Sequence, residues 1–355
     1  MPCPRGNPFT TCASTTAIPW VLPVRKTDAS FLGGRGRGLG RLFSMLPNVQ
    51  HLTALAPMQD VTDLAFMRVL ARIGSLPDVF VTAYFRSTST TCAIAENNLR
   101  CIRENETGVP ILAQLAGAEA APLMRDAEWL MQLPVAGINL NAGCPAPLVN
   151  RHGAGAGLLR DLPALQAAVQ GLRACVPAGQ LSIKFRTGWE SPAELPAILD
   201  IIRAASPDYA MLHGRTRKDL YRPGTVSTQA VCRAVQYLPC PVLGNGDICT
   251  PEQAQHWLTH ISPAGVMIGR GAVRNPYIFR QIKGGPAPTA DEMKHYYRVL
   301  AEETDRILHT KRTPAGHCNR MKKYLAYCYA DFTPEQEYAL RRCTDIDSML
   351  RILCG

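Results

Sequence analysis

Short apolar runs recur between residues 52 and 271, and helix-like stretches rich in alanine and leucine separate them. There are eight such runs, spaced by roughly 30 residues, and each ends in glycine, proline or a polar residue. The predicted strands are residues 52–58, 78–84, 111–117, 137–143, 182–188, 209–215, 241–247 and 265–271. The predicted helices include 163–176, 192–205 and 251–260. Ser191 and Thr250, each followed by proline, are the expected N-caps of the last two helices.

Eight successive strand–helix units predict an α/β fold, namely a closed parallel (β/α)8 or TIM barrel. A doubly wound sheet is the alternative, but no Gly-x-Gly-x-x-Gly motif follows the first run. Polar residues gather where the runs end. They are Gln114, Asn141, Lys184, Arg186, His213, Arg215, Asn245, Asp247 and Arg270. Because barrel enzymes build their sites at the carboxyl ends of the strands, this pattern predicts an active site there.

The chain changes character after residue 286. A joint is marked by Pro286, Pro288 and Thr289. Three helical patterns follow it, at 290–309, 314–330 and 334–353. We therefore expect a catalytic barrel over residues 49–286 and a small helical domain over residues 287–355.

The middle helix of this second region combines an apolar stripe with a basic face. The stripe, spaced i, i+3, i+4 and i+7, consists of Met321, Tyr324, Leu325 and Cys328. Residues 306–323 contain six Lys and Arg and no acid. This face is either a solvated surface or one that contacts phosphates, with Tyr327 available to stack on a base.

Charge is concentrated near the start of the 355-residue chain, whose formal net charge is +10. Residues 1–44 carry six Lys and Arg against one Asp, a balance of +5, without helical or strand periodicity. We expect residues 1–48 to be a basic, disordered leader, or part of an over-long gene model whose true start is Met45. An organelle-targeting peptide or an RNA-binding arm is the alternative.

The lengths of the apolar runs and the spacing of the cysteines argue against a membrane-spanning protein and against a metal-binding protein. No apolar run reaches the roughly 18 residues of a membrane span. The 13 cysteines include no Cys-x-x-Cys pair and no His/Cys cluster at zinc spacing, which argues against a metal site. Scattered thiols without a secretion signal predict a cytoplasmic protein. We also expect a monomer.

The fourth run, 137–143, ends in an amide side chain, a glycine turn and a thiol. Gly143 and Pro145 stop the strand, so Asn141 and Cys144 are expected at its carboxyl end. An isolated cysteine is more often a small buried hydrophobe. The other strand ends give this cysteine a chemical context.

The last two runs predict a phosphate site. Residues 243–247 and 268–271 place flexible backbone N–H groups and one guanidinium where late barrel strands commonly hold a phosphate. With residues 56–58 and Gln114, the pocket suits a phosphorylated planar ring, for which FMN is the natural candidate. Lys184 fits as a cation beside the flavin ring. Alternatively, Lys184 pairs with an acid inside the barrel.

A chemical role for Cys144 follows from this pocket. A cysteine thiol has an ordinary pKa near 8.5 and is mostly protonated at neutral pH. It can donate a proton to one carbon of a polarised C=C bond while a flavin delivers hydride to the other. A nucleophilic role is less attractive because no single histidine is marked as its base, although His152 and His213 are possible.

Seven motifs together resemble the tRNA-dihydrouridine synthases, over residues 52–353. These motifs are APMQDVTD (56–63), QLAG (114–117), INLNAGCPAPLVNRHGAGAGLL (138–159), KFRTGW (184–189), HGRTRKDLYRPG (213–224), GNGDI (244–248) and MIGRGAVRNPYIF (267–279). The resemblance implies a TIM-barrel flavoenzyme that uses FMN and NADPH to reduce the C5=C6 bond of a D-loop uridine in tRNA. It also implies that the helical C-terminal domain binds tRNA.

The resemblance assigns roles to individual residues. Cys144 resembles the acid that protonates C5, and Asn141 resembles the residue that holds the flipped base. Positions that match FMN contacts are Pro57, Met58, Gln59, Gln114, Lys184, His213, Asn245, Gly246, Asp247, Gly269 and Arg270. Positions expected to contact the substrate or tRNA are Arg86, Arg186, Tyr221, Arg320, Lys322, Tyr327 and Arg342.

Several features are similar to the branch that modifies position 16. These are Val149-Asn150, Gly188-Trp189 followed by an acid, and Arg320-Met321-Lys322. Three features depart from the family pattern. Asp60 replaces a glycine, Val226-Ser227 stands near an expected tryptophan, and Ala83 stands where an acid is expected. The rival interpretations are a small-molecule flavoprotein of the dihydroorotate dehydrogenase kind and an RNA-binding barrel that has lost activity.

Overall fold

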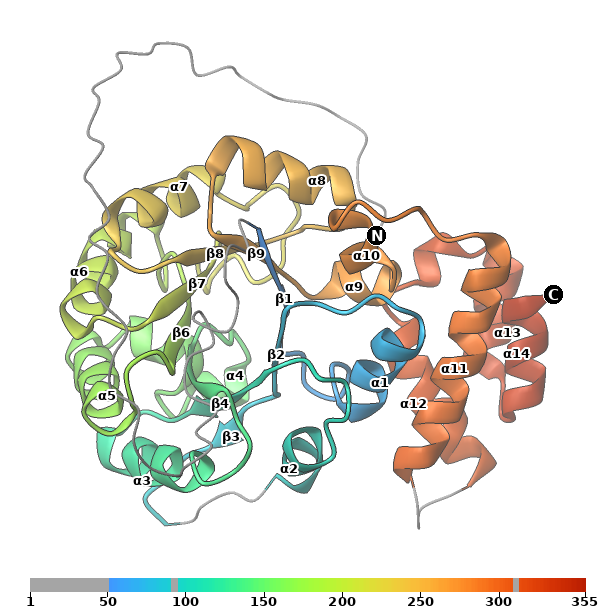
Figure 1. Cartoon of the computed structure of the whole chain (residues 1–355), viewed down its shortest axis with the longest axis horizontal. Helices are drawn as coiled ribbons and strands as arrows, with labels where there is room; N and C mark the ends of the chain where they lie inside the picture. The colour runs from blue at the N-terminus through green and yellow to red at the C-terminus, as the bar shows by residue number, and fades with distance from the viewer. Residues whose placement is uncertain (1–50, 91–94, 309–312) are drawn as a thin grey trace, which may run out of the picture. The chain divides into compact units, whose positions relative to one another are not determined.

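The computed structural model describes residues 51–90, 95–308 and 313–355. Its centre is a closed barrel of parallel strands inside a ring of helices (Figure 1). The strands are β1 Leu52–Leu55, β2 Val79–Val81, β3 Phe85–Arg86, β4 Ile111–Ala116, β5 Gly137–Ala142, β6 Leu181–Arg186, β7 Tyr209–His213, β8 Val242–Asn245 and β9 Gly265–Ile268. Pairing of β2 with both β1 and β4, and of β1 with β9, closes the ring. The predicted (β/α)8 barrel is confirmed.

The second predicted strand, 78–84, is interrupted, and β3 was not predicted. Thr82 donates its backbone N–H to Leu112, but its Oγ1 accepts from the N–H of Gln114, which displaces a ladder bond. The Nδ2 of Asn98 then donates to the carbonyls of Ala83 and Tyr84. The strand breaks because side chains take over its backbone partners, and pairing resumes at β3.

Helices follow the strands as predicted. They are α1 Leu64–Arg72, α2 Glu96–Arg103, α3 Ala120–Leu130, α4 Pro147–Asn150, α5 Leu162–Cys175, α6 Leu195–Ala205, α7 Thr228–Tyr237, α8 Pro251–His256, α9 Arg270–Arg274 and α10 Ile278–Ile282. Ser191 and Thr250 are confirmed as N-caps, and each forms a capping box with the residue three positions later. Two predicted helices are subdivided, because 192–194 forms a 3₁₀ turn and 257–261 a π turn.

Four helices complete the chain: α11 Ala290–Leu308, α12 Pro314–Leu325, α13 Pro334–Arg342 and α14 Ile346–Cys354. The single helix predicted over 334–353 is wrong. Cys343 leaves the helical conformation and Asp345 caps a new helix by accepting from the N–H of Ser348. The helix predicted over 314–330 ends at Leu325 and is followed by a 3₁₀ turn. The predicted leader, Met45, and residues 309–312 lie outside the described residues.

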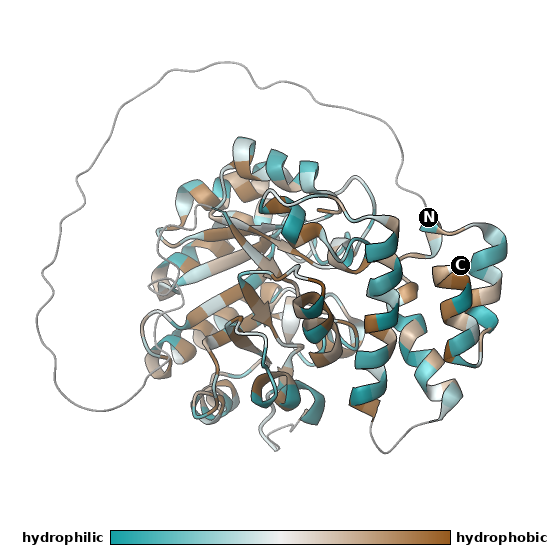
Figure 2. Ribbon diagram, turned by 45° about the vertical axis from the view of Figure 1, so that its right-hand side comes forward, coloured by the Kyte–Doolittle hydropathy of each residue, from teal (hydrophilic) through white to brown (hydrophobic). Residues whose placement is uncertain are grey.

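The core joins the barrel to the C-terminal helices. Apolar residues occupy the strands and the helix faces turned toward them, while the outer faces are hydrophilic (Figure 2). The predicted stripe at 321, 324, 325 and 328 is buried in this core. Between α1 and α11, Arg72 Nη1 lies 2.8 Å from Oε1 of Glu303, whose side chain is 1% exposed. Among the described residues, no helix is long and apolar enough to cross a membrane.

Candidate active site

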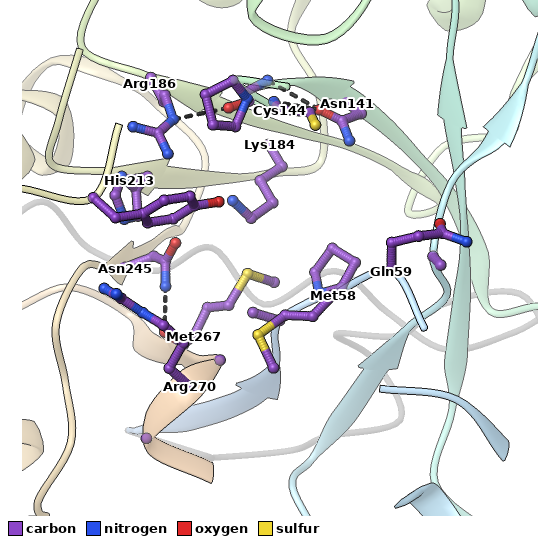
Figure 3. A pocket seen from close by; sticks show the side chains of 18 of the residues that line it. Met58, Gln59, Asn141, Cys144, Lys184, Arg186, His213, Asn245, Met267 and Arg270 are labelled. Atoms are coloured by element: carbon purple, nitrogen blue, oxygen red, sulfur yellow. Dashed lines mark hydrogen bonds between the residues drawn. The ribbon is translucent and has the colours of Figure 1, made fainter. Parts of the chain in front are cut away.

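A cavity of about 470 Å³ opens at the carboxyl ends of the barrel strands. Most of the predicted site residues line it, from β1 through β9 (Figure 3). They are Pro57, Met58, Gln59, Gln114, Asn141, Cys144, Lys184, Arg186, His213, Tyr221, Asn245, Asp247, Gly269, Arg270 and Tyr327. The predicted residues outside the lining are Arg86, Gly246, Arg320, Lys322 and Arg342. The structure thus brings together side chains from strands far apart in sequence.

A chain of amides fixes the end of β5. Asn141 Oδ1 accepts from the backbone N–H of Gly143 at 3.1 Å and of Cys144 at 2.9 Å. Its Nδ2 donates to Gln114 Oε1 at 2.8 Å, and Gln114 Nε2 donates to Asn139 Oδ1 at 2.7 Å. Because these buried amides satisfy one another, the thiol-bearing turn has one preferred geometry.

Cys144 is partly exposed and is part of the cavity lining. Asn150 Nδ2 donates to the Cys144 carbonyl at 2.7 Å, and the Ala156 N–H donates to the same oxygen at 3.0 Å. Gly155 has φ +61°, and a Cβ there would lie 3.0 Å from the Cys144 carbonyl oxygen. Only glycine fits beneath the cysteine. Asn150 was noted only as a feature similar to the position-16 branch and Gly155 only as part of its motif, so the support that they give to Cys144 was not predicted.

Opposite charges meet at the ends of β7, β8 and β9. Arg215 Nη1 donates to Asp247 Oδ1 at 2.9 Å, and Arg270 Nη2 donates to the same oxygen at 2.6 Å. The Arg215 side chain is 0% exposed, whereas that of Arg270 is 38% exposed. Asp247 has φ +47° and follows Gly246 at φ +143°, so two successive residues leave the ordinary backbone regions. The predicted phosphate segments are therefore neighbours.

The cavity has a positive field. Burial, and then the charge of Arg186, lower the pKa of Lys184 to about 8. Burial and the cations of Arg186, Lys184 and Arg215 hold the pKa of His213 well below its usual range. The Nδ1 atom of His213 is buried without a hydrogen-bond partner. A negatively charged ligand would relieve this repulsion.

Arg186 and Tyr221 cover one side of the cavity. Arg186 is buried, and its Nε donates to the Gly143 carbonyl at 2.8 Å. Tyr221 is 51% exposed, and its ring lies 5.2 Å from the guanidinium of Arg186 and 4.9 Å from that of Arg270. An aromatic ring beside two cations is a surface on which a planar ligand can stack.

Residues of α12 contact the first strand end. Arg320 forms an ion pair with Asp63, whose Oδ1 also accepts from the Tyr324 hydroxyl at 2.9 Å. Lys323 Nζ lies 3.0 Å from Asp60 Oδ2. Asp60 has φ +60°, the left-handed conformation that glycine adopts readily. These ion pairs join the helical region to the loop that carries Met58 and Gln59.

The departure at Val226-Ser227 and two residues predicted to contact tRNA also have defined neighbours in the structure. Val226 methyl groups lie against Gly246, and Ser227 caps α7. Lys322 is partly exposed, and the Arg342 guanidinium lies over the exposed ring of Tyr338. The tRNA-contact assignments remain predictions. Within the described ranges, no group of three or more His, Cys, Asp or Glu side chains could hold a metal ion.

The fold and the cavity define a (β/α)8-barrel protein with a basic site at the carboxyl ends of its strands. A model described as dihydrouridine synthase (Dus) matches residues 54–351, and the chain belongs to this family. The tRNA-dihydrouridine(16) synthase of Haemophilus ducreyi is 32% identical over 284 residues, covering 77% of this chain and 85% of that protein. The enzyme of the same name from Salmonella typhimurium is 29% identical over 307 residues, covering 82% and 96%.

These matches confirm the resemblance drawn from the motifs, including the likeness to the position-16 branch. Among solved structures, the old yellow enzyme homologue from Zymomonas mobilis matches with a TM-score of 0.47 and 11% identity. That match covers 67% of this chain and 89% of the other. A likeness of this size carries no argument about function.

Proposed function

We propose that this protein is a tRNA-dihydrouridine synthase that reduces the C5=C6 bond of uridine 16 in the D-loop of tRNA. The observation that carries the proposal is the single cavity that contains Cys144, Lys184 and the Asp247–Arg270 pair. A thiol, a cation and an anion-binding end are what flavin-dependent reduction of a uracil requires. Family membership and the names of the relatives support the choice of uridine in tRNA.

The cavity residues fit FMN, which we propose as the cofactor, with NADPH as the electron donor. His213 Nδ1 is buried without a partner, and Lys184 lies among positive charges, so both favour an anionic ligand. Gly269 leaves room at the cavity wall, since a Cβ there would lie 3.3 Å from Met58 Sδ and from Ala56 Cβ. The side chains of Asn245 and Arg270 and the backbone N–H groups of Gly246 and Asp247 would hold the phosphate end. Bound there and reduced, FMN would supply hydride for C6 of the uracil.

The residues of the chain would supply the remaining chemistry. Cys144 donates the proton that C5 acquires, because the residue lines the cavity and its backbone N–H is held by the Asn141 amide oxygen. Asn141 orients the base, Gln114 would contact FMN, and Lys184 would stabilise negative charge on the flavin ring. The hydride and the proton together saturate the C=C bond, and Cys144 is left as a thiolate.

We further propose that the helical region, residues 287–355, binds tRNA and that residues 49–286 form the catalytic domain. A uridine in folded tRNA must leave its stack to enter a cavity, which requires anchorage away from the chemistry. Tyr221 and Tyr327 line the cavity and can stack on bases. The cations proposed to contact tRNA are Arg86, Arg186, Arg320, Lys322 and Arg342.

Mapping dihydrouridine along tRNA from cells with and without the gene tests this function. We expect loss of the modification at position 16 alone, restored by the wild-type gene. Purified protein should bind FMN, absorb near 450 nm and act on unmodified tRNA with NADPH. Equal turnover on free pyrimidines would contradict the proposal in favour of a small-molecule flavoprotein. A colourless protein after supply of FMN would support a non-catalytic RNA-binding barrel instead.

The pKa of Lys184 predicts how FMN affinity depends on pH. In the protein without ligand, Lys184 is charged below about pH 8 and neutral above it. An anionic ligand raises this pKa, so binding takes up a proton above pH 8 and weakens by up to about tenfold per pH unit. Quenching of flavin fluorescence between pH 7 and pH 9.5 measures the effect.

Lys184→Arg is the control for this pH dependence, because arginine stays charged throughout the range. Its affinity should stay level between pH 7 and pH 9.5. A level profile in the wild-type protein would show that Lys184 does not contact the anionic ligand.

A further inference from the structure

Large apolar side chains are exposed beside the cavity. In the part of the chain that the structure describes, the exposed large apolar side chains are Leu148 at 55%, Leu220 at 45%, Tyr221 at 51%, Tyr237 at 38% and Tyr338 at 62%, and only the first three belong to segments that line the cavity. Leu148 lies on α4, within the loop that follows β5, and Leu220 and Tyr221 lie on the loop that follows β7; both loops contribute to the cavity lining. Exposed apolar groups that gather at a site mark an interaction surface.

Neither burial nor backbone conformation explains why position 220 is a leucine. It is not buried, and its φ of +52° places it in the left-handed region that bulky residues avoid. Glycine or asparagine would adopt this conformation with less strain. Backbone strain of this kind persists where the surrounding structure enforces it, and it clusters at functional sites. Burial within the chain therefore does not account for the side chain of Leu220.

Hydrogen bonds join the two loops into one frame. Arg186 donates from Nε to the Gly143 carbonyl at 2.8 Å and from Nη1 to the Leu220 carbonyl at 2.9 Å. Arg217 Nε donates to Asn150 Oδ1 at 3.1 Å. Leu148 and Leu220 are therefore held in fixed relation to the turn that carries Cys144.

The charge of the same loops indicates the class of partner. Residues 143–153 and 214–226 carry exposed or partly exposed basic side chains, and Asp219 is their one acid. The basic side chains are Arg151, Arg217, Lys218 and Arg222. A basic surface with apolar side chains among its charges is complementary to nucleic acid, which offers phosphates and the faces of bases.

We propose that Leu148 and Leu220 form an apolar wedge that contacts the nucleobases flanking the uridine that enters the cavity. This inference rests on the proposed function. When one base leaves the stack, its neighbours lose a stacking face, and apolar side chains inserted beside them compensate for that loss. The wedge would act on folded tRNA and have less to contribute where no stack is opened.

The double variant Leu148→Ala, Leu220→Gly tests the wedge. Glycine at 220 removes the side chain and the backbone strain together, so the melting temperature should not fall through that change. We expect kcat/KM for dihydrouridine formation in folded tRNA to fall about tenfold, as expected for losing a partly buried leucine contact. On a short single-stranded RNA carrying the same uridine, the loss should be less than about threefold.

Two further variants sharpen the test. Leu148→Met keeps an apolar side chain of similar volume and should lose far less activity on tRNA than the double variant. Tyr237→Ala removes an exposed large side chain at the end of α7, away from the carboxyl ends of the strands, and should also act like wild type. If the double variant matches active wild-type protein on tRNA, or loses equally on both RNAs, the wedge is wrong. If wild-type protein forms no dihydrouridine at all, the proposed function is wrong, and this inference falls with it.

Discussion

Replacing Cys144 by alanine is expected to reduce dihydrouridine formation by about 10² to 10⁴-fold, the usual contribution of a positioned general acid. The thiol lies on a turn that Asn141 and Asn150 hold from two sides, so its removal should leave the turn in place. Flavin content and tRNA affinity should therefore stay near wild type. Single-turnover reduction of tRNA by prereduced enzyme measures the chemical step directly.

Two controls separate acidity from structure. Cys144→Ser keeps the size and the hydrogen bonding of the side chain but replaces the thiol by a much weaker acid, so its activity should stay low. Cys175→Ala removes a partly buried thiol at the end of α5, away from the cavity, and should act like wild type. Near-normal turnover by Cys144→Ala would exclude the proton-donor role.

Replacing Arg215 by methionine is expected to lower the free energy of unfolding by about 3 kcal/mol, the lower end of the range for breaking a buried ion pair. Arg215 is fully buried, pairs with Asp247, and also donates to Thr225 Oγ1 at 2.8 Å. The loss lies at the lower end because Asp247 is partly exposed and keeps Arg270 as a partner. Urea denaturation of the protein without FMN measures this change.

The same variant should bind FMN about tenfold more weakly. Without Arg215, the carboxylate of Asp247 holds Arg270 more tightly and opposes a phosphate at the same place. Adding Asp247→Asn removes that carboxylate and should recover part of the affinity. Arg222→Ala breaks an exposed ion pair with Asp219 and should change stability by less than about 1 kcal/mol. Equal effects of the two arginine variants would contradict the structural role of Arg215.

At the phosphate end of the cavity, the sequence predicted the anion site but not the buried arginine next to it. Glycines at strand ends and one arginine predicted where an anion binds, and the structure places Asp247 and Arg270 in contact there. The sequence offered no sign that Arg215, two residues past the end of β7, is buried beneath them. Burial of a charged side chain depends on which acid faces it, and that acid lies 32 residues further along the chain.

The end of the first strand also makes contacts that the sequence did not predict. Asp60 stands where a glycine is expected, and the structure gives this residue a left-handed backbone and an ion pair with Lys323. Arg320 was predicted to contact tRNA, and in this structure it pairs with Asp63. Neither partner could be predicted, because each pair joins residues more than 250 positions apart.

The sequence by itself determined the eight strand–helix units, the polar strand ends, the Cys144 turn and the family. These follow from local periodicity, from turn residues and from motifs that lie within a few dozen positions. Only the tertiary structure decided the break that creates β3, the split of the last helix, the amide chain behind Cys144 and the partners of Asp60, Arg215 and Arg320. Such features arise from contacts between distant segments, whose hydrogen bonds and charges are satisfied only once the barrel has closed and the C-terminal helices have packed against it.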